Sequence, residues 1–156
     1  MRTIKVKKYS DLIEEHVAEH AVITPGMLVT PSSANKVRPH NEAEGNAIPM
    51  FALEDELQGK NIDVNYAIGD PVQVWIPGRG DQVYAILKDD ENVAVGDFLV
   101  SAGNGELQKK TLLESMESHA VDSRMTIVAQ AIEAVDLSDS SGTWPASRRR
   151  IKVRIV

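Results

Sequence analysis

Two histidines are the first residues whose types and spacing could do chemistry. His16 and His20 lie four residues apart in a stretch rich in helix formers, and on a helix that spacing would place both imidazoles on one face. Glu19 is misplaced for the His-Glu-x-x-His pattern of metalloproteases, and a third ligand would have to come from elsewhere. Two surface histidines on a polar helix are the favoured interpretation, so the sequence predicts no metal site and no cofactor.

A run of three carboxylates, Glu54, Asp55 and Glu56, is the second candidate. General acid–base catalysis needs two carboxylates that face one substrate, but adjacent side chains point in different directions. A solvated loop is therefore favoured over a catalytic pair. The chain also lacks the Gly-x-Ser-x-Gly, P-loop and Gly-x-Gly-x-x-Gly patterns. It contains no cysteine, which excludes thiolate nucleophiles, cysteine zinc sites and disulfides. We expect no enzyme.

The tripeptide Arg79-Gly80-Asp81 is a sequence that integrin-type receptors bind when a loop presents it. It lies in "PGRGD", where proline presets one turn dihedral, glycine permits positive φ and aspartate can cap backbone N–H groups. Turn chemistry therefore explains every residue except Arg79, and a tight turn is favoured over a receptor ligand. The turn would nonetheless be exposed at a hairpin tip, so both interpretations stay open.

Two tryptophans could stack on carbohydrate, Trp75 and Trp144. Aromatic residues make up only 4% of the chain. Such a pair is more often one core anchor and one loop or interface anchor, and this interpretation is favoured.

The elements that must position these residues are short strands. Turn signals recur at short intervals, and runs such as "VQVWI", "QVYAIL" and "DFLVS" between them are rich in β-branched and aromatic residues. This pattern predicts a small sandwich or barrel. The runs at 72–76 and 82–87 are expected to pair as a hairpin across the Pro77–Asp81 turn. Only the stretches 11–21 and 112–120 have helix formers for two or three turns, and the second is short enough to be a loop.

Charge is distributed unevenly along the 156 residues, whose net charge is −6. The first eight positions contain four basic residues and the last nine contain five, with no acidic residue in either end. The body between them has eight basic residues and all 23 acidic ones. An acidic body does not suit nucleic acid, which needs a continuous positive surface. The basic ends either dock on an acidic surface, the chain's own or a neighbour's, or form edge strands whose charges oppose aggregation.

No stretch is apolar enough for a bilayer span or a signal peptide. We therefore expect a protein that contacts no membrane and that is made and kept in a cytosol, unless it leaves as part of something larger. A chain of this length suits one domain with arms.

The order of strands and turns resembles that of the capsid cement, or head decoration, proteins of tailed bacteriophages. The resemblance covers residues 21–156 and rests on "AVITPGMLVTPSSANKV", "VAVGDFLVSAGNGEL", "IVAQAIEAVD" and "RIKVRIV" with the segments between them. It implies an all-β fold, a small β-barrel or β-tulip-like sandwich over residues 21–156, preceded by an extended N-terminal arm over residues 1–20.

The same resemblance implies a function. Cement proteins bind the outside of the phage head, commonly as homotrimers above three-fold and quasi-three-fold junctions of the major capsid protein, and stabilise the shell against DNA pressure. We therefore expect a virion protein made in the bacterial cytoplasm. Its arm would contact the capsid through basic residues: Arg2, Lys5, Lys7 and Lys8. The alternative is a surface-displayed binding module that engages a receptor or glycan through Arg79-Gly80-Asp81 or an exposed tryptophan.

Overall fold

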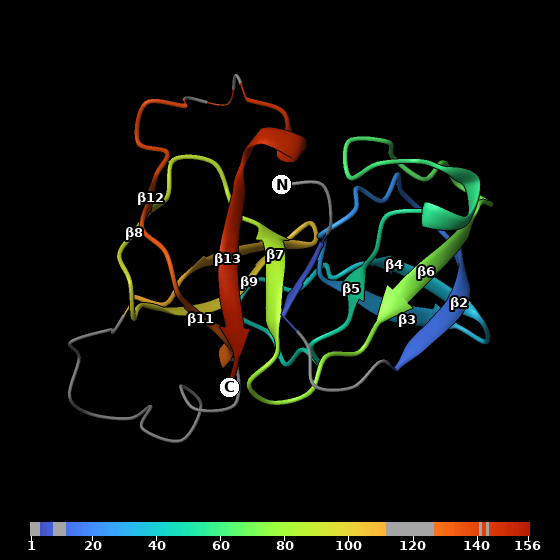
Figure 1. The fold of residues 1–156 in the computed structure, drawn as a ribbon, viewed down its shortest axis with the longest axis horizontal. Helices are drawn as coiled ribbons and strands as arrows, with labels where there is room; N and C mark the ends of the chain where they lie inside the picture. The colour runs from blue at the N-terminus through green and yellow to red at the C-terminus, as the bar shows by residue number, and fades with distance from the viewer. Residues whose placement is uncertain (1–3, 8–11, 112–126, 141, 143) are drawn as a thin grey trace.

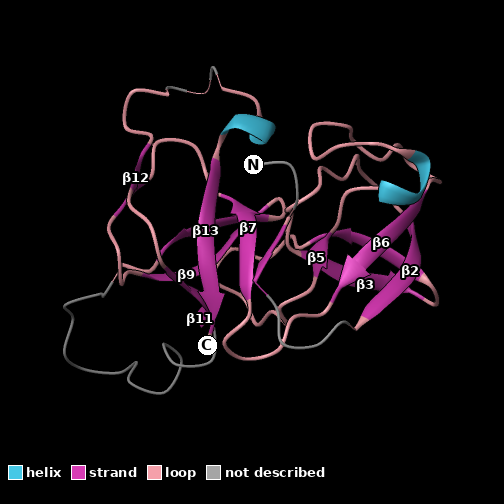
Figure 2. Cartoon of the chain, in the orientation of Figure 1, coloured by secondary structure: helices cyan, strands magenta, loops and turns pink. Residues whose placement is uncertain are grey.

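The fold is known from a computed structural model, which describes residues 4–7, 12–111, 127–140, 142 and 144–156. The described residues form strands and loops with no α-helix, and two short 3₁₀ turns at Glu56–Gln58 and Ala146–Arg148 (Figure 2). The all-β prediction is confirmed. The strands are β1 (Lys5–Lys7), β2 (Ile13–Ala18), β3 (Val29–Ser33), β4 (Lys36–Pro39), β5 (Phe51–Ala52), β6 (Pro71–Trp75), β7 (Gln82–Ile86), β8 (Asn92–Val93), β9 (Phe98–Gly103), β10 (Glu106–Lys109), β11 (Ile127–Ala131), β12 (Val135–Asp136) and β13 (Arg150–Ile155).

Six strands form a curled sheet in the order β1-β7-β13-β11-β9-β10 (Figure 1). A bridge between Leu87, just after β7, and Leu107 in β10 links the far strand back to β7, and Lys88 N donates to Leu107 O at 2.7 Å. The sheet therefore closes into a small barrel, which leaves β1 as an added strand outside β7. A separate pair, β8 and β12, lies in the connections of this half.

The second sheet has five strands in the order β3-β4-β2-β6-β5. β2 lies inside it, antiparallel to β6 from Ile13 to Val17 and parallel to β4 at Val17 and Ala18. The helix expected over residues 11–21 is therefore wrong. The backbone N–H and C=O groups of β2 form hydrogen bonds with the strands on both sides. The stability gained from these tertiary hydrogen bonds outweighs the local preference of the sequence for a helix. The other expected helix, over residues 112–120, falls outside the described residues.

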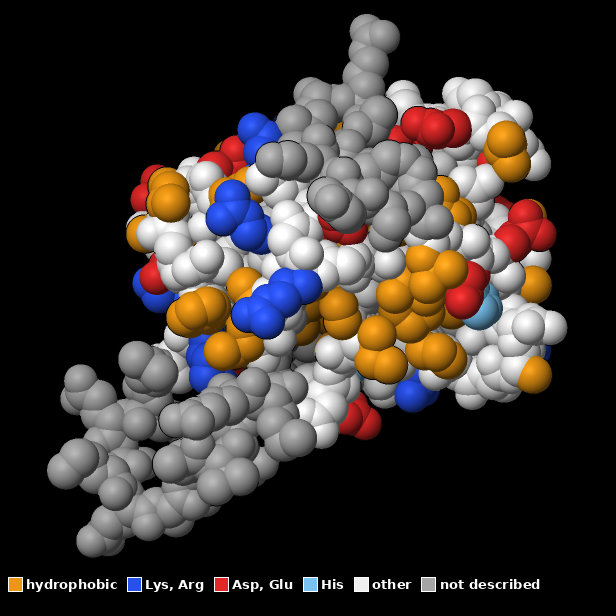
Figure 3. Space-filling model, turned by 60° about the horizontal axis from the view of Figure 1, so that its bottom comes forward, with side chains coloured by type: hydrophobic (Ala, Val, Ile, Leu, Met, Phe, Trp, Pro, Cys, Tyr) orange, Lys and Arg blue, Asp and Glu red, His pale blue; other side chains and the backbone are white. Residues whose placement is uncertain are grey.

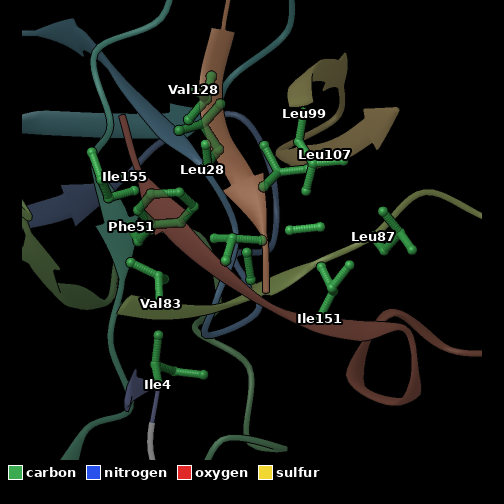
Figure 4. Close-up of a cluster of buried hydrophobic side chains, with 14 of the residues drawn as sticks. Ile4, Leu28, Phe51, Val83, Leu87, Leu99, Leu107, Val128, Ile151 and Ile155 are labelled. Carbon is green, nitrogen blue, oxygen red and sulfur yellow. The ribbon is translucent and has the colours of Figure 1, made fainter. Parts of the chain in front are cut away.

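Buried apolar side chains form two clusters, and strands of the second sheet contribute side chains to both of them. One fills the barrel and includes Ile4, Val83, Leu99 and Ile155 (Figure 4), together with Val153. The other includes Val37, Tyr66, Val72 and Val74. Strand β6 serves both, because Val72 and Val74 point to the second cluster whereas Trp75 reaches the barrel. β5 does the same with Ala52 and Phe51, so the two halves are packed through common strands.

Burial shapes the chemistry of Tyr66 in the second cluster. Its hydroxyl donates to Leu53 O at 2.9 Å, and burial, reinforced by the charge of Asp55, raises the pKa of Tyr66 well above its usual value. Tyr66 is therefore a neutral structural donor.

Among the described residues no helix is long and apolar enough to cross a membrane.

Candidate functional site

The Pro77–Asp81 connection is not a hairpin. β6 pairs with β2 and β5 in the five-stranded sheet, whereas β7 pairs with β1 and β13 in the barrel. The turn therefore carries the chain from one sheet to the other. Its local chemistry is as predicted, since Gly80 has φ +93° and Asp81 caps the turn.

Asp81 is buried within this turn. Its side chain is only 2% exposed, and Oδ2 accepts a hydrogen bond from Gly78 N at 2.8 Å. Backbone hydrogen bonds of 2.9 and 3.0 Å link Gly80 and Asp81 to Ile155 in the last strand. The exposed part of the expected recognition turn is therefore limited to Arg79 and Gly80.

The turn forms part of a surface that we call the basal surface: Leu12, Ile13, Arg79, Arg154 and Val156. Ile76 N donates to Leu12 O at 2.9 Å, and Gly80 N donates to Ile155 O, so backbone contacts link the three segments. Figure 1 places the C-terminus and the β6–β7 connection at one end of the molecule, and Figure 3 brings that end forward. On this face hydrophobic side chains lie beside lysine and arginine, and acidic side chains lie near them.

The basal surface combines exposed apolar groups with free cations. Leu12 is 52% exposed, Ile13 41% and Val156 43%. Arg79 and Arg154 are exposed and form no ion pair with any described residue. A partner with acidic groups around an apolar patch would complement this surface.

The residues predicted to form the capsid-binding arm are only partly within the described structure. Arg2 and Lys8 fall outside the described residues, and Lys5 and Lys7 belong to β1, where Lys5 lies opposite Val83 and Lys7 opposite Gln82. Gln82 in turn lies opposite Arg154. The backbone positions of Lys7 and Arg154 thus share one row across the barrel strands, and β1 adjoins the basal surface.

The described part of residues 1–20 contributes strands to both sheets rather than extending from the body. Ile4 is fully buried in the barrel cluster, and its N–H lies 3.1 Å from Glu54 Oε2. The expected edge position holds for β1 but not for β13, which lies inside the six-stranded sheet.

Two C-terminal arginines dock on the chain's own body. Arg149 donates to Glu106 Oε1 at 2.6 Å and to Leu87 O at 3.1 Å. Arg150 donates from Nη1 to Pro25 O and from Nη2 to Ile62 O, both at 2.6 Å, and its guanidinium carbon lies 5.8 Å from the centre of the Tyr84 ring. Burial lowers the pKa of Arg150, and nearby acidic groups oppose this shift.

A glycine makes the Arg150 contact possible. Gly26 has φ +93°, and a Cβ added there would lie 2.5 Å from Arg150 Nη1 and 2.8 Å from Tyr84 O. Only glycine fits this position. Sequence reasoning missed the buried role of Arg150, because the alternation with Ile151 and Val153 places it on the outward face of the strand, where loops cover it.

The histidine and carboxylate candidates do not assemble into a reactive site. His16 lies on strand β2, whereas His20 lies beyond the end of this strand at a φ of 71°, so the two imidazoles do not share a helix face. Across the described ranges no three His, Cys, Asp or Glu side chains come together as metal ligands. His16 instead lies 2.9 Å from Glu14 Oε2.

The solvated loop expected at Glu54 and Asp55 is wrong, because these residues are only 2% and 8% exposed. Glu54 accepts from the Ile4 backbone and Asp55 pairs with Lys60 at 3.3 Å. The expectation for the tryptophans is confirmed: Trp75 is fully buried and Trp144 is 45% exposed.

One histidine–serine pair escaped sequence reasoning because its members are 61 residues apart. His40 Nδ1 lies 2.7 Å from Ser101 Oγ, and Nε2 lies 3.1 Å from Asn46 O. A carbonyl can only accept, so Nε2 carries the proton of this hydrogen bond, and in a neutral imidazole Nδ1 would then accept from the serine hydroxyl. Both side chains are buried and Ser101 Oγ also accepts from Gly103 N. The pair therefore joins two segments and is closed to a substrate.

Comparison with known proteins gives a fold relationship. The sequence matches no family model and no curated protein. Its fold is similar to a solved structure, the head fiber gp8.5 N base of bacteriophage phi29, with a TM-score of 0.55 and 11% sequence identity. The match covers 94% of this chain and 95% of that chain. The likeness thus extends over nearly the whole of both chains, and at this identity it concerns the fold.

Proposed function

We propose that this protein is a structural component of a bacteriophage head that binds the outside of the shell. The observation that carries the proposal is the shared architecture with the phi29 head fiber base over 94% of the chain. The strand order that resembles phage cement proteins supports the same class. The expected role is mechanical, since a protein that binds the assembled shell but not free subunits stabilises the shell by mass action.

The contact with the shell is proposed to lie on the basal surface and the adjoining β1 strand. Arg79 and Arg154 supply unpaired charge, and Leu12, Ile13 and Val156 supply apolar area. The arm residues Arg2, Lys5, Lys7 and Lys8 would extend this positive region. The acceptor would be the major capsid protein at three-fold and quasi-three-fold junctions, which matches a homotrimer in symmetry.

The alternative of a receptor-binding module loses support at Asp81. A receptor that reads Arg-Gly-Asp needs the carboxylate, but Asp81 is 2% exposed and bound to the turn backbone. This observation favours the turn interpretation of Arg79-Gly80-Asp81.

The test is binding to heads of the phage that encodes the chain. The purified protein should cosediment with heads that lack it and raise the temperature at which they release DNA. An Arg79→Glu/Arg154→Glu double variant should bind at least tenfold more weakly, whereas Lys88→Glu, which also inverts exposed charge, should bind normally. Circular dichroism confirms that each variant is folded. Failure of the unaltered protein to bind would overturn the function, and normal binding of the double variant would overturn the basal surface.

The arm and the trimer need separate measurements. Deletion of residues 2–19 is unsuitable, because it removes the buried Ile4 and both β1 and β2. Lys5→Gln/Lys7→Gln should instead weaken cosedimentation while the fold is kept, and unchanged binding would count against the arm. Light scattering should give about three times 17.1 kDa in solution or, after release, from the shell. A monomer in both states would contradict the homotrimer.

A further inference from the structure

A hollow of about 400 Å³ opens between three segments that are distant in sequence. Its walls come from the turn after β2, which contributes His20 and Val22, from Arg38 on β4 with the following Asn41, and from Asn104 at the tip of the β9–β10 hairpin. The volume falls within the roughly 300–1,000 Å³ range of small-molecule sites. Val22 and Met27 provide an apolar part of the wall.

Three of the polar side chains that line this hollow are unpaired, whereas His20 Nε2 lies 3.3 Å from Glu19 Oε2. The side chains of Arg38, Asn41 and Asn104 form no hydrogen bond or ion pair with any described residue. Arg38 Nε is fully buried and has no partner in this part of the chain. A buried donor without a partner lowers the stability of the fold by about 1–3 kcal/mol. A ligand that accepts a hydrogen bond from the guanidinium would remove this cost.

The charge of the hollow is opposite to that of the whole chain. The chain has a net charge of −6, yet no carboxylate is among the described residues that line the hollow, and Arg38 lines it as a permanent cation. The two asparagines add four N–H donors that suit anionic and hydroxyl oxygens.

The walls are held in place by backbone contacts rather than by the side chains that face the hollow. Gly105 N donates to His40 O at 2.9 Å, and Leu28 N donates to Gly105 O at 2.8 Å, so the hairpin tip is fixed beside β4. A Cβ added to Gly105 would meet Leu28 O, Met27 Cβ and Pro39 Cβ at 3.1 Å each. Asn104 is thus presented beside Asn41 by a tightly fitted turn.

We propose that this hollow is a binding site for a small organic carboxylate. Arg38 would pair with the carboxylate, since a guanidinium offers parallel N–H donors that match its two oxygens. Asn41 and Asn104 would bind neighbouring hydroxyl or amide groups, and Val22 and Met27 would contact a short apolar part. The hollow shares no residue with the basal surface. The test of this binding site is therefore independent of the test of the proposed capsid contact.

Two matched pairs of probes test this site by nuclear magnetic resonance on the full chain. D-glucuronate differs from D-glucose, and N-acetylglycine from N-acetylglycinamide, by a carboxylate in place of a neutral group. At least one carboxylate probe should shift the Arg38 Nε–H signal and the Asn41 and Asn104 amide signals saturably at millimolar concentration. Its neutral partner should bind at least tenfold more weakly. Inorganic phosphate serves as a third arm, and equal or tighter phosphate binding would overturn the assignment to carboxylates.

Variants separate a site from a general charge effect. Arg38→Met keeps the apolar stem and should weaken carboxylate binding at least tenfold, whereas Lys88→Met removes an exposed charge elsewhere and should leave it unchanged. Asn104→Gly removes the side-chain amide while permitting the positive φ of 58° at this position, and should weaken binding about threefold or more. It serves as the second test if Arg38→Met does not fold. Absence of saturable shifts at the hollow, or equal binding by these variants, would overturn the proposal.

Discussion

At the scale of single residues, Asp81 shows how a side chain in a recognition-like sequence can serve structure instead. Its carboxylate is buried and caps Gly78 N. We predict that Asp81→Ala lowers the free energy of unfolding by about 1–3 kcal/mol, because it removes the charged acceptor of the hydrogen bond from Gly78 N. Arg79→Ala should change it by less than about 0.5 kcal/mol, as is usual for an exposed side chain. Urea unfolding followed by circular dichroism measures both, and equal effects would mean that the cap contributes nothing.

Arg150 is a charged residue that stabilises the fold by donating hydrogen bonds to backbone carbonyl groups. It donates to Pro25 O, Ile62 O and Ser147 O, which lie in segments far apart in sequence. We predict that Arg150→Met lowers the free energy of unfolding by roughly 3 kcal/mol, because buried carbonyls lose charged donors. Arg154→Met on the same strand is the matched control, since Arg154 is exposed. A loss no larger than that of the control, in the same urea titration, would show that water replaces the guanidinium.

At the scale of elements, most strands could be predicted from the sequence because they combine β-branched residues with turn signals. β7 and β13 fall within "QVYAIL" and "RIKVRIV", and β9 begins in "DFLVS" and continues to Gly103. The Asn-Gly sequence at Asn104, which is typical of a hairpin turn, joins β9 to β10. The closure of the barrel through Leu87 and Leu107 could not be predicted, since it depends on a bridge between residues twenty apart.

Three local predictions failed for one physical reason, which is that partners distant in sequence decide them. β2 carries helix formers but gains hydrogen bonds from β4 and β6. The Pro77–Asp81 turn has hairpin chemistry, but its two strands find other neighbours. The sequence around Glu54 predicts a solvated loop, but Glu54 accepts a hydrogen bond from Ile4 N, fifty residues away. The sites followed the same rule: Asp81 was identified as a turn cap, whereas the Arg38 hollow joins three segments that no local motif connects.

The β3–β4 hairpin is tied to the end of β2 by Glu19. The Glu19 carboxylate accepts a hydrogen bond from Lys36 Nζ at 2.8 Å and another from Ser32 Oγ at 2.6 Å. These two hydrogen bonds, of which that from Lys36 has the larger effect, lower the pKa of Glu19 from 4.5 to about 2. Because the folded state binds this proton less tightly than the unfolded state, the stabilisation is present above pH 4.5. It is lost as the pH falls through the interval from about 4.5 to about 2.

We therefore predict a pH-dependent effect of Glu19→Gln. The variant should unfold at a lower urea concentration than the native protein at pH 6, and the difference should shrink below pH 4.5 and vanish near pH 2. Glu15→Gln, which removes an exposed carboxylate without an ion-pair partner among the described residues, should show no such convergence. A difference for Glu19→Gln that is constant with pH would mean that packing rather than charge is responsible.

At the scale of the whole molecule, the two apolar clusters are joined by strands that serve both. β5 directs Phe51 to the barrel and Ala52 to the second cluster, and β6 does the same with Trp75 and Val74. The β6–β7 connection and the bridge between Ala43, after β4, and Ala102 in β9 add backbone links between the halves. Removal of one sheet would therefore expose side chains that fill the other, so neither half has a complete core of its own.

This arrangement predicts one cooperative unfolding transition. Val153→Ala in the barrel and Val74→Ala in the second cluster should each lower the free energy of unfolding by roughly 2 kcal/mol, since each deletes two buried methyl groups. Each should shift the transition seen by tryptophan fluorescence, which reports the burial of Trp75, together with that seen by far-ultraviolet circular dichroism, which reports all strands. Two separate transitions, with Val153→Ala moving one and Val74→Ala the other, would show that the shared strands do not couple the halves. Coincident transitions in both variants would instead mean that the shared strands couple the two halves into one cooperative unit.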